Sequence, residues 1–263
     1  MNRLVQGGLI RLYQLVKATG ALHTPTGRKI FETSYRFYKD RFEAGPIRLL
    51  RPWVRPGTFV IDVGANIGFF TRQFATWVGE GGKVIAVEPE ALNYSRLQHA
   101  VAEAGLTDVV ETIQAAVAER SGEGLLEVNP GHPGDHKLGT KGVPITMTTI
   151  DELLATRGWP EVSLIKVDVQ GAEARVLAGA RQTLAKFRPA LFLEVDDQQL
   201  RQFGSSAGEL LTSATSQGYT IHSRVGKGIS NPLCVDQVLA LGESKEYVDM
   251  LLLPSQAETA NSR

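Results

Sequence analysis

The chain has 263 residues, of which 28 are basic and 28 acidic, so its formal net charge is zero. This length fits one large domain with a short extension, and a hydrophobic content of 43% excludes a disordered chain. A neutral total argues against general nucleic-acid binding, and the single cysteine, Cys234, excludes an internal disulfide and a cysteine-based zinc site. No apolar run reaches the roughly 18 residues that cross a bilayer. The N-terminus carries no signal-peptide core, so we expect a cytoplasmic protein.

The charge is unevenly distributed along the chain. Residues 1–50 contain nine Lys and Arg against three Asp and Glu, whereas the remainder contains 19 against 25. The first residues also carry an apolar stripe at helical spacing, formed by Val5, Leu9, Leu12 and Val16. We predict a helical N-terminal extension over 1–50 that acts as an acceptor cap or an oligomer contact. Peripheral membrane contact through residues 1–20 and a homodimer are further expectations.

From residue 58 the pattern changes to short apolar runs that alternate with amphipathic segments. Strands are predicted at 59–63, 84–87, 109–113, 164–169 and 191–195, and helices at 68–78, 91–104, 172–186 and 205–217. An antiparallel pair, 219–223 and 237–241, is expected to close the sheet. The glycine-rich stretch 120–142 is predicted to be a long surface loop. We therefore predict one α/β domain over 51–254 with a doubly wound, mostly parallel sheet, followed by a disordered tail at 255–263.

A glycine-rich turn follows the first predicted strand, in the pattern Asp62-x-Gly64-x-Asn66-x-Gly68. Glu88 ends the second strand, where a carboxylate can accept hydrogen bonds from a ribose diol. A dinucleotide-binding fingerprint has three glycines, and here Asn66 stands in place of the middle one. A carboxylate beside the turn suits a cationic ligand better than a pyrophosphate. The motif therefore favours S-adenosylmethionine over NAD.

Two more carboxylates follow later strands. Asp168 ends the fourth strand and Glu194 ends the fifth, so we expect both at the cofactor cleft. They can hold Mg²⁺ through oxygen ligands, or one of them can act as a general base. His136, in the predicted loop, is another candidate base. We assign Glu173 to the first turn of the next helix as a cap, and residues 196–197 to a solvated loop.

At these motifs the sequence resembles the FkbM family of class I S-adenosylmethionine-dependent methyltransferases. The resembling segments are FVIDVGANIGFFT (59–71), VIAVEPEALNYSRLQHAV (84–101), MTTIDELL (147–154), LIKVDVQGAEARVLAGA (164–180) and RPALFLEVD (188–196). The fourth-strand block, Lys-x-Asp-x-Gln-Gly-Ala-Glu, is the most specific to the family. Many relatives have Glu at the position of Gln170, and both residue types can form the same kind of hydrogen bond.

The resemblance implies a Rossmann-like, seven-stranded sheet and O-methylation of a hydroxyl on a sugar, a glycan or a secondary metabolite, with no nucleic-acid partner. By position it implies that the cofactor contacts Asp62, Gly64, Ala65, Asn66, Gly68, Glu88, Asn93, Ala116, Asp168 and Gln170. Within this set, Glu88 would hold the ribose, Asn93 and Ala116 would flank the adenine, and Asp168 would lie where cofactor and acceptor meet. Two alternatives stay open: an NAD-dependent oxidoreductase or epimerase, and a non-catalytic methyltransferase-like partner subunit.

Overall fold

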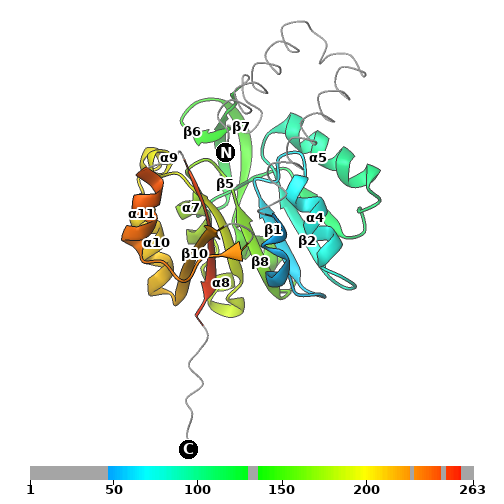
Figure 1. The fold of residues 1–263 in the computed structure, drawn as a ribbon. Coiled ribbons are helices and arrows are strands. Elements are labelled where there is room, and N and C mark those ends of the chain that lie inside the picture. Colours follow the sequence, from blue (N-terminus) through cyan, green and yellow to red (C-terminus); the bar gives the residue numbers. More distant parts are fainter. Residues whose placement is uncertain (1–46, 130–135, 226–227, 244–246, 256–263) are drawn as a thin grey trace, which may run out of the picture.

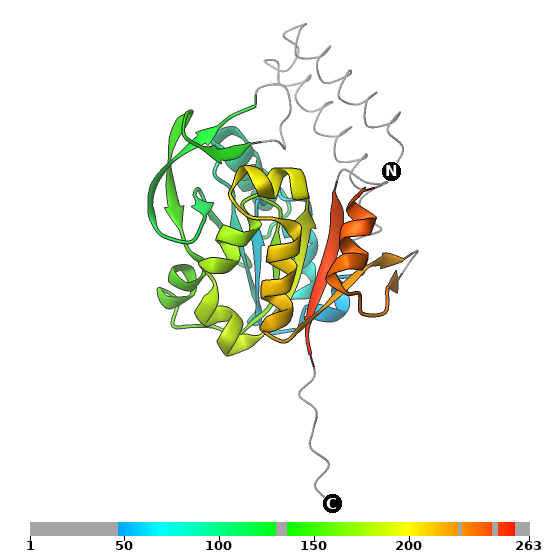
Figure 2. The same ribbon diagram turned by 90° about the vertical axis from the view of Figure 1, so that its left-hand side faces the viewer.

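The computed structural model describes residues 47–129, 136–225, 228–243 and 247–255. Most of the predicted N-terminal extension (1–46) and of the predicted tail (256–263) lies outside the described residues. The described part is an α/β domain with a large sheet covered by helices on both faces and a second, smaller sheet at one end (Figures 1 and 2). None of the described helices combines the length and the apolar character needed to cross a bilayer.

The large sheet confirms the predicted doubly wound topology. Its strand order is β11-β10-β12-β9-β8-β1-β2-β3. Strands β1, β2, β3, β8 and β9 pair in parallel, whereas β12 runs antiparallel to both β9 and β10. The family resemblance implied seven strands, and the sheet has an eighth, β11, of two residues. The bounds are β1 Phe59–Val63, β2 Lys83–Val87, β3 Val110–Ile113, β8 Val162–Val167, β9 Ala190–Val195, β10 Tyr219–Val225, β11 Gly228–Ile229 and β12 Val248–Pro254.

Alternate residues along the central strands pack against different helical layers. In β1, Val60 contacts the cluster that includes Phe74 and Leu97 of helices α4 and α5, whereas Ile61 contacts the cluster under helices α6–α8, α10 and α11. Leu50 and Val54, just before the sheet, are buried in the α4–α5 layer. The helices are α4 Phe69–Trp77, α5 Ala91–Glu103, α6 Ile150–Ala155, α7 Glu173–Ala178, α8 Arg181–Phe187, α9 Asp197–Gln202, α10 Ala207–Ser216 and α11 Val235–Glu243.

The prediction of a long surface loop over 120–142 was wrong. Together with flanking residues, this stretch forms a four-stranded sheet of order β4-β7-β5-β6, with bounds β4 Ala116–Val117, β5 Gly122–Glu127, β6 Lys137–Gly139 and β7 Val143–Thr148. Two of its glycines, Gly124 and Gly139, make room for neighbouring side chains. A Cβ on Gly124 would lie 2.7 Å from the sulfur of Met147, and one on Gly139 would lie 2.3 Å from Glu127 Oε1.

Two other element predictions were also wrong. The stretch 237–241 belongs to helix α11, and the strand that pairs with β10 is β12. A stretch with four consecutive apolar residues, Val238 to Leu241, is too short to distinguish helical from strand periodicity. The predicted helix 172–186 is two helices, α7 and α8, which are separated at Gly179. A Cβ at Gly179 would lie 2.1 Å from the Ala118 carbonyl oxygen, so the chain needs glycine where it passes the small sheet.

Candidate active site

A cavity of about 620 Å³ of empty volume lies at the carboxyl ends of β1, β2 and β8. Ligands of doubly wound sheets bind at this edge because the strand order reverses there. The small sheet closes the cavity from the opposite side through Leu126 and Leu138. Eight of the predicted site residues line it: Gly64, Asn66, Glu88, Asn93, Ala116, His136, Asp168 and Gln170.

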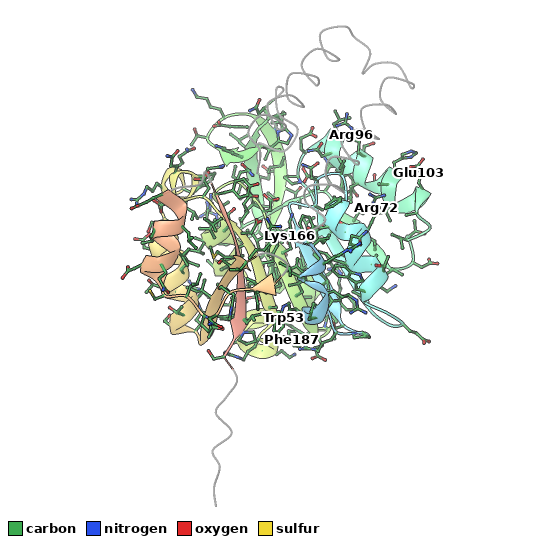
Figure 3. The ribbon with its side chains drawn as sticks, viewed as in Figure 1. Trp53, Arg72, Arg96, Glu103, Lys166 and Phe187 are labelled. Carbon is green, nitrogen blue, oxygen red and sulfur yellow. The ribbon has the colours of Figure 1, made fainter. Side chains whose placement is uncertain are left out.

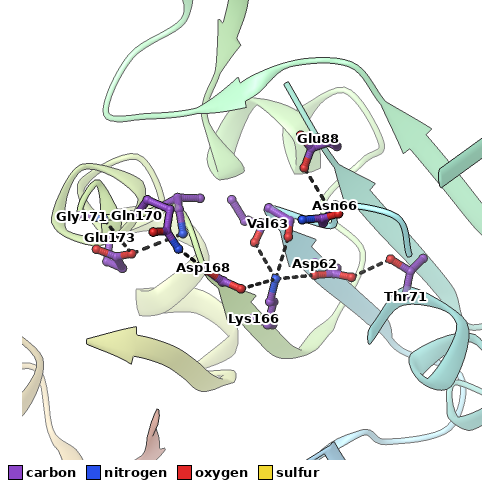
Figure 4. A network of polar contacts seen from close by, with 12 residues as sticks. Asp62, Val63, Asn66, Thr71, Glu88, Lys166, Asp168, Gln170, Gly171 and Glu173 are labelled. Atoms are coloured by element: carbon purple, nitrogen blue, oxygen red, sulfur yellow. Dashed lines mark hydrogen bonds and ion pairs between the residues drawn. The ribbon is translucent and has the colours of Figure 1, made fainter. Parts of the chain in front are cut away.

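An ammonium group buried between two carboxylates stands at the centre of the site (Figure 4). Lys166 Nζ lies 3.3 Å from Asp62 Oδ1 and 3.6 Å from Asp168 Oδ2, and it donates to the carbonyl oxygens of Val63 at 3.3 Å and Gly64 at 2.8 Å. Asp62 is completely buried, and its second oxygen accepts a 2.6 Å hydrogen bond from the Thr71 hydroxyl. Of Lys166 and its two carboxylate partners, only Asp168 lines the cavity, and two formal negative charges against one positive charge make the cluster net negative.

Register explains why these groups meet. Asp62 of β1 and Lys166 of β8 are paired positions in the parallel ladder, so their side chains leave the sheet on the same face. The Lys166 ammonium also lies 5.3 Å from the centre of the Phe70 ring, on helix α4. Figure 3 shows Lys166 in the middle of the domain. The lysine therefore joins the end of β1 to the end of β8 behind the Gly64 and Asp168 lining of the cavity.

Gly64 allows the two strands to approach closely. Its φ of +73° lies in the left-handed region, and a Cβ there would lie 2.0 Å from the carbonyl oxygen of Asp168. Any other residue would separate the ends of β1 and β8. The glycine thus holds Asp168 directly beside the turn that follows β1, where the Asp168 N–H donates to the Val63 carbonyl at 3.2 Å.

Glu88 is buried at the end of β2, yet its carboxylate lines the cavity. Its two oxygens accept backbone N–H groups, Oε2 from Asn66 at 2.9 Å and Oε1 from Glu90 at 3.0 Å. Burial raises the pKa of Glu88 to about 7, because desolvation outweighs these hydrogen bonds and the Lys166 charge. Each carboxylate oxygen keeps a second lone pair, so Glu88 can still accept two hydroxyl groups.

The loop after β8 fixes the orientation of Asp168 and Gln170. Gln170, in the left-handed region at φ 55°, donates to Asp168 Oδ1 at 3.4 Å and accepts from the Gln199 side chain at 3.0 Å. Glu173 lies in the first turn of α7, as predicted, and accepts from the backbone N–H groups of Val169 and Gly171. Burial raises the pKa of Glu173 to about 7. This carboxylate supports the loop and does not line the cavity.

Residues 196–197 are not a solvated loop. Asp196 is the N-cap of helix α9 and accepts from the N–H groups of Gln198 and Gln199. Asp197 accepts from Ala207 N and forms an ion pair with Arg201. Both acids are structural, because they accept hydrogen bonds from backbone N–H groups at the starts of α9 and α10. Helix α9 in turn carries Gln199, which donates to the Gln170 side chain.

Not every predicted residue reaches the cavity. Asp62 is buried behind the lining, and Ala65 and Gly68 shape the turn behind the cavity. Glu194 lies within β9 in register with Asp249 of β12. His136 does line the cavity, and its Nδ1 accepts the Asn129 backbone N–H at 3.1 Å. Among the described residues, no group of three or more His, Cys, Asp or Glu is arranged to hold a metal ion.

Lys166 is the site residue that sequence reasoning overlooked. A lysine in the middle of a strand whose six residues are all buried is the available signal, because an unpaired buried ammonium is costly. Leu126 and Leu138 were also missed, because they belong to strands of the small sheet in a stretch predicted to be a loop. They lie far from β1 in sequence, so no local pattern could predict that they contact the same cavity.

Known proteins provide an independent comparison. The 2-O-methyltransferase NoeI of Sinorhizobium fredii is 25% identical over 166 residues, which cover 56% of this chain and 66% of that protein. The hexuronic acid methyltransferase AglP of Haloferax volcanii is 31% identical over 180 residues, 67% of this chain and 72% of that protein. The 31-O-demethyl-FK506 methyltransferase FkbM of Streptomyces tacrolimicus is 28% identical over 207 residues, 64% of this chain and 75% of that protein. Residues 62–221 match the methyltransferase FkbM domain, and the chain therefore belongs to the FkbM family of methyltransferases.

Proposed function

We propose that this protein is an S-adenosylmethionine-dependent O-methyltransferase whose acceptor is a hydroxyl of a sugar, a glycan or a secondary metabolite. Family membership supports methyl transfer, and the names of the relatives describe a 2-O-methyltransferase, a hexuronic acid methyltransferase and an O-demethyl-FK506 methyltransferase. The observation that carries the proposal is the net negative constellation of Asp62, Lys166 and Asp168 beside the buried Glu88. It argues against NAD, whose pyrophosphate these carboxylates would repel.

The described residues fit S-adenosylmethionine. The Gly64 turn admits a ligand close to the backbone, and the Glu88 carboxylate has acceptor positions for a ribose diol. Asn93 and Ala116 line the cavity near Glu88, where they would flank the adenine. The carboxylates of Asp62 and Asp168 supply the negative charge that a cationic ligand requires. When bound, this cofactor supplies a methyl group on a sulfonium carbon that an acceptor oxygen can attack in line.

Asp168 is the proposed group that accepts the acceptor hydroxyl's proton. Its side chain is 35% exposed, and its two oxygens are held by Gln170 and Lys166. His136 is less suited to this role in the observed arrangement. Its Nδ1 accepts a backbone N–H, which leaves the proton of the neutral ring on Nε2 as a donor.

Mg²⁺ at Asp168 and Glu194 stays a prediction. The donor set does not fit it well, since the Lys166 ammonium lies 3.6 Å from Asp168 and Glu194 does not line the cavity. We therefore propose no metal step, and unchanged turnover in excess chelator is the expected result. A homodimer and membrane contact through residues 1–20 also stay predictions, because residues 1–46 lie outside the described residues.

Calorimetric titration with S-adenosylmethionine and with NAD tests the cofactor, and release of S-adenosylhomocysteine in the presence of sugar acceptors tests turnover. We expect Asp168→Asn to lower turnover by about 10²- to 10⁴-fold, the range of general-base catalysis, while cofactor affinity changes less than tenfold. Binding of NAD without binding of S-adenosylmethionine would overturn the proposal. Full activity of Asp168→Asn would remove Asp168 as the base. Cofactor binding without turnover on any acceptor would support the non-catalytic alternative.

A further inference from the structure

A second hollow adjoins the cofactor cavity. This β6–α7 groove has about 1440 Å³ of empty volume and lies between β6, the outer face of α7 and the turn after α9. Figure 1 shows these three elements on the same side of the domain. Leu138 lines both the groove and the cofactor cavity, and so does the start of α7, whose N-cap Ala172 lies at the cavity and whose Ala174 lies in the groove. The groove and the cofactor cavity therefore lie on either side of Leu138 and the start of α7.

The groove is lined by polar side chains together with the apolar Leu138, Ala174, Ala178 and Phe203. Glu119, Glu127, Lys137 and Arg175 contribute two formal negative and two formal positive charges, so the lining is balanced overall. Thr140, Gln202 and Ser205 add neutral donors and acceptors, and Phe203 adds one aromatic ring. Such a surface suits a neutral ligand that carries many hydroxyl groups, and it suits a flat apolar metabolite or a polyanion poorly.

Arg175 is a preorganised donor in this groove. Glu119 holds its guanidinium through two hydrogen bonds, from Nε at 2.6 Å and from Nη2 at 2.8 Å. The Arg175 side chain is 31% exposed, and no hydrogen bond joins its Nη1 to any residue that the structure describes. The charge is thus neutralised locally while two N–H groups stay oriented for another acceptor.

We infer that the β6–α7 groove binds sugar units of a neutral oligosaccharide acceptor next to the unit that is methylated. Sugar rings present hydroxyl groups that donate and accept, together with an apolar C–H face, which matches the polar lining and the Phe203 ring. This inference rests on the proposed function and narrows its acceptor class. It means that the length of the acceptor oligosaccharide is recognised by groove residues and not by Asp62, Lys166 and Asp168.

The test compares neutral tetrasaccharides of glucose, of N-acetylglucosamine and of rhamnose with the corresponding monosaccharides as methyl acceptors. We expect at least one tetrasaccharide to have a KM at least tenfold below that of its monosaccharide. Thr140→Trp places a large ring in the groove at an exposed position, so the tetrasaccharide-to-monosaccharide ratio of kcat/KM should fall at least tenfold. Gln202→Ala, which removes one exposed amide, should raise the tetrasaccharide KM about fivefold, as expected for one lost hydrogen bond.

The control is Thr212→Trp, an exposed position on α10 outside the groove, which should change no kinetic constant. Binding of S-adenosylmethionine is measured for every variant, so that misfolding is detected. A protein that does not bind this cofactor contradicts the proposed function itself. If the protein methylates only monosaccharides or non-sugar acceptors, or if Thr140→Trp keeps the ratio of wild type, the groove inference is wrong while the proposed function stands.

Discussion

Replacing Lys166 with methionine removes the ammonium but keeps an unbranched side chain in the core. At the observed distances of 3.3 and 3.6 Å, each ion pair of Lys166 has a Coulomb energy on the order of 5 kcal/mol at an effective dielectric constant of about 20. Much of this attraction only compensates for the desolvation of the lysine and the two carboxylates. The measured cost of breaking a buried pair by removing one partner is about 3–5 kcal/mol, and we expect Lys166→Met to lose that much stability.

The loss falls mainly on Asp62. This residue is 0% exposed and, among the described residues, would keep only its hydrogen bond from Thr71. The Asp168 side chain is 35% exposed, so solvent can stabilise it. The double variant Asp62→Asn/Lys166→Met leaves no unpaired buried charge. It should therefore be more stable than Lys166→Met alone, with a coupling free energy of at least about 2 kcal/mol.

Urea unfolding of the four proteins in this cycle measures the coupling, and calorimetry measures the affinity for S-adenosylmethionine. We expect that affinity to fall at least tenfold in Lys166→Met, because the Gly64 carbonyl and the Asp168 carboxylate lose their shared partner. Lys186→Met, an exposed lysine 5.4 Å from the Trp159 ring, is the matched control and should cost no more than about 1 kcal/mol. A loss below about 1 kcal/mol in Lys166→Met, or additive effects in the cycle, would refute the reasoning.

Two further predictions concern the strand ends. Gly64→Ala should cost at least about 3 kcal/mol more than Gly105→Ala in urea unfolding, because both glycines have positive φ but only Gly64 would place a Cβ 2.0 Å from the β8 backbone. Equal costs would show that the close approach is unimportant. The Glu88 pKa is about 7 in the folded protein, above its ordinary value of 4.5, so its contribution to stability is present below about pH 4.5 and is lost as the pH rises through 7. The free energy of unfolding of Glu88→Gln should therefore gain about 3 kcal/mol relative to wild type between pH 4.5 and 8, and a difference that does not vary with pH would contradict this. Glu173, which has the same direction of shift, keeps its own contribution in both proteins.

The parallel half of the sheet follows from local sequence. The run 59–63 is one strand with the bounds predicted for it, because β-branched and apolar residues end at a turn of glycines. The same holds for β2, β8 and β9 to within two residues. Local sequence predicted the wrong secondary structure where contacts with distant residues determine it. The stretch 237–241, with four apolar residues, forms part of a helix, and Gly124 and Gly139 lie in strands that approach their neighbours closely.

For the site, the sequence by itself determined the residue types and the strand ends that carry them. Asp62, Glu88 and Asp168 each lie within one residue of the end of an apolar strand, and parallel strands end at one edge. Only the tertiary structure decided that Lys166 bonds to the Val63 carbonyl, 103 positions away, and that the small sheet covers the cavity through Leu138. Those contacts depend on the register between β1 and β8 and on the packing of two sheets. Both are set by the burial of surfaces distant in sequence, for which no local pattern exists.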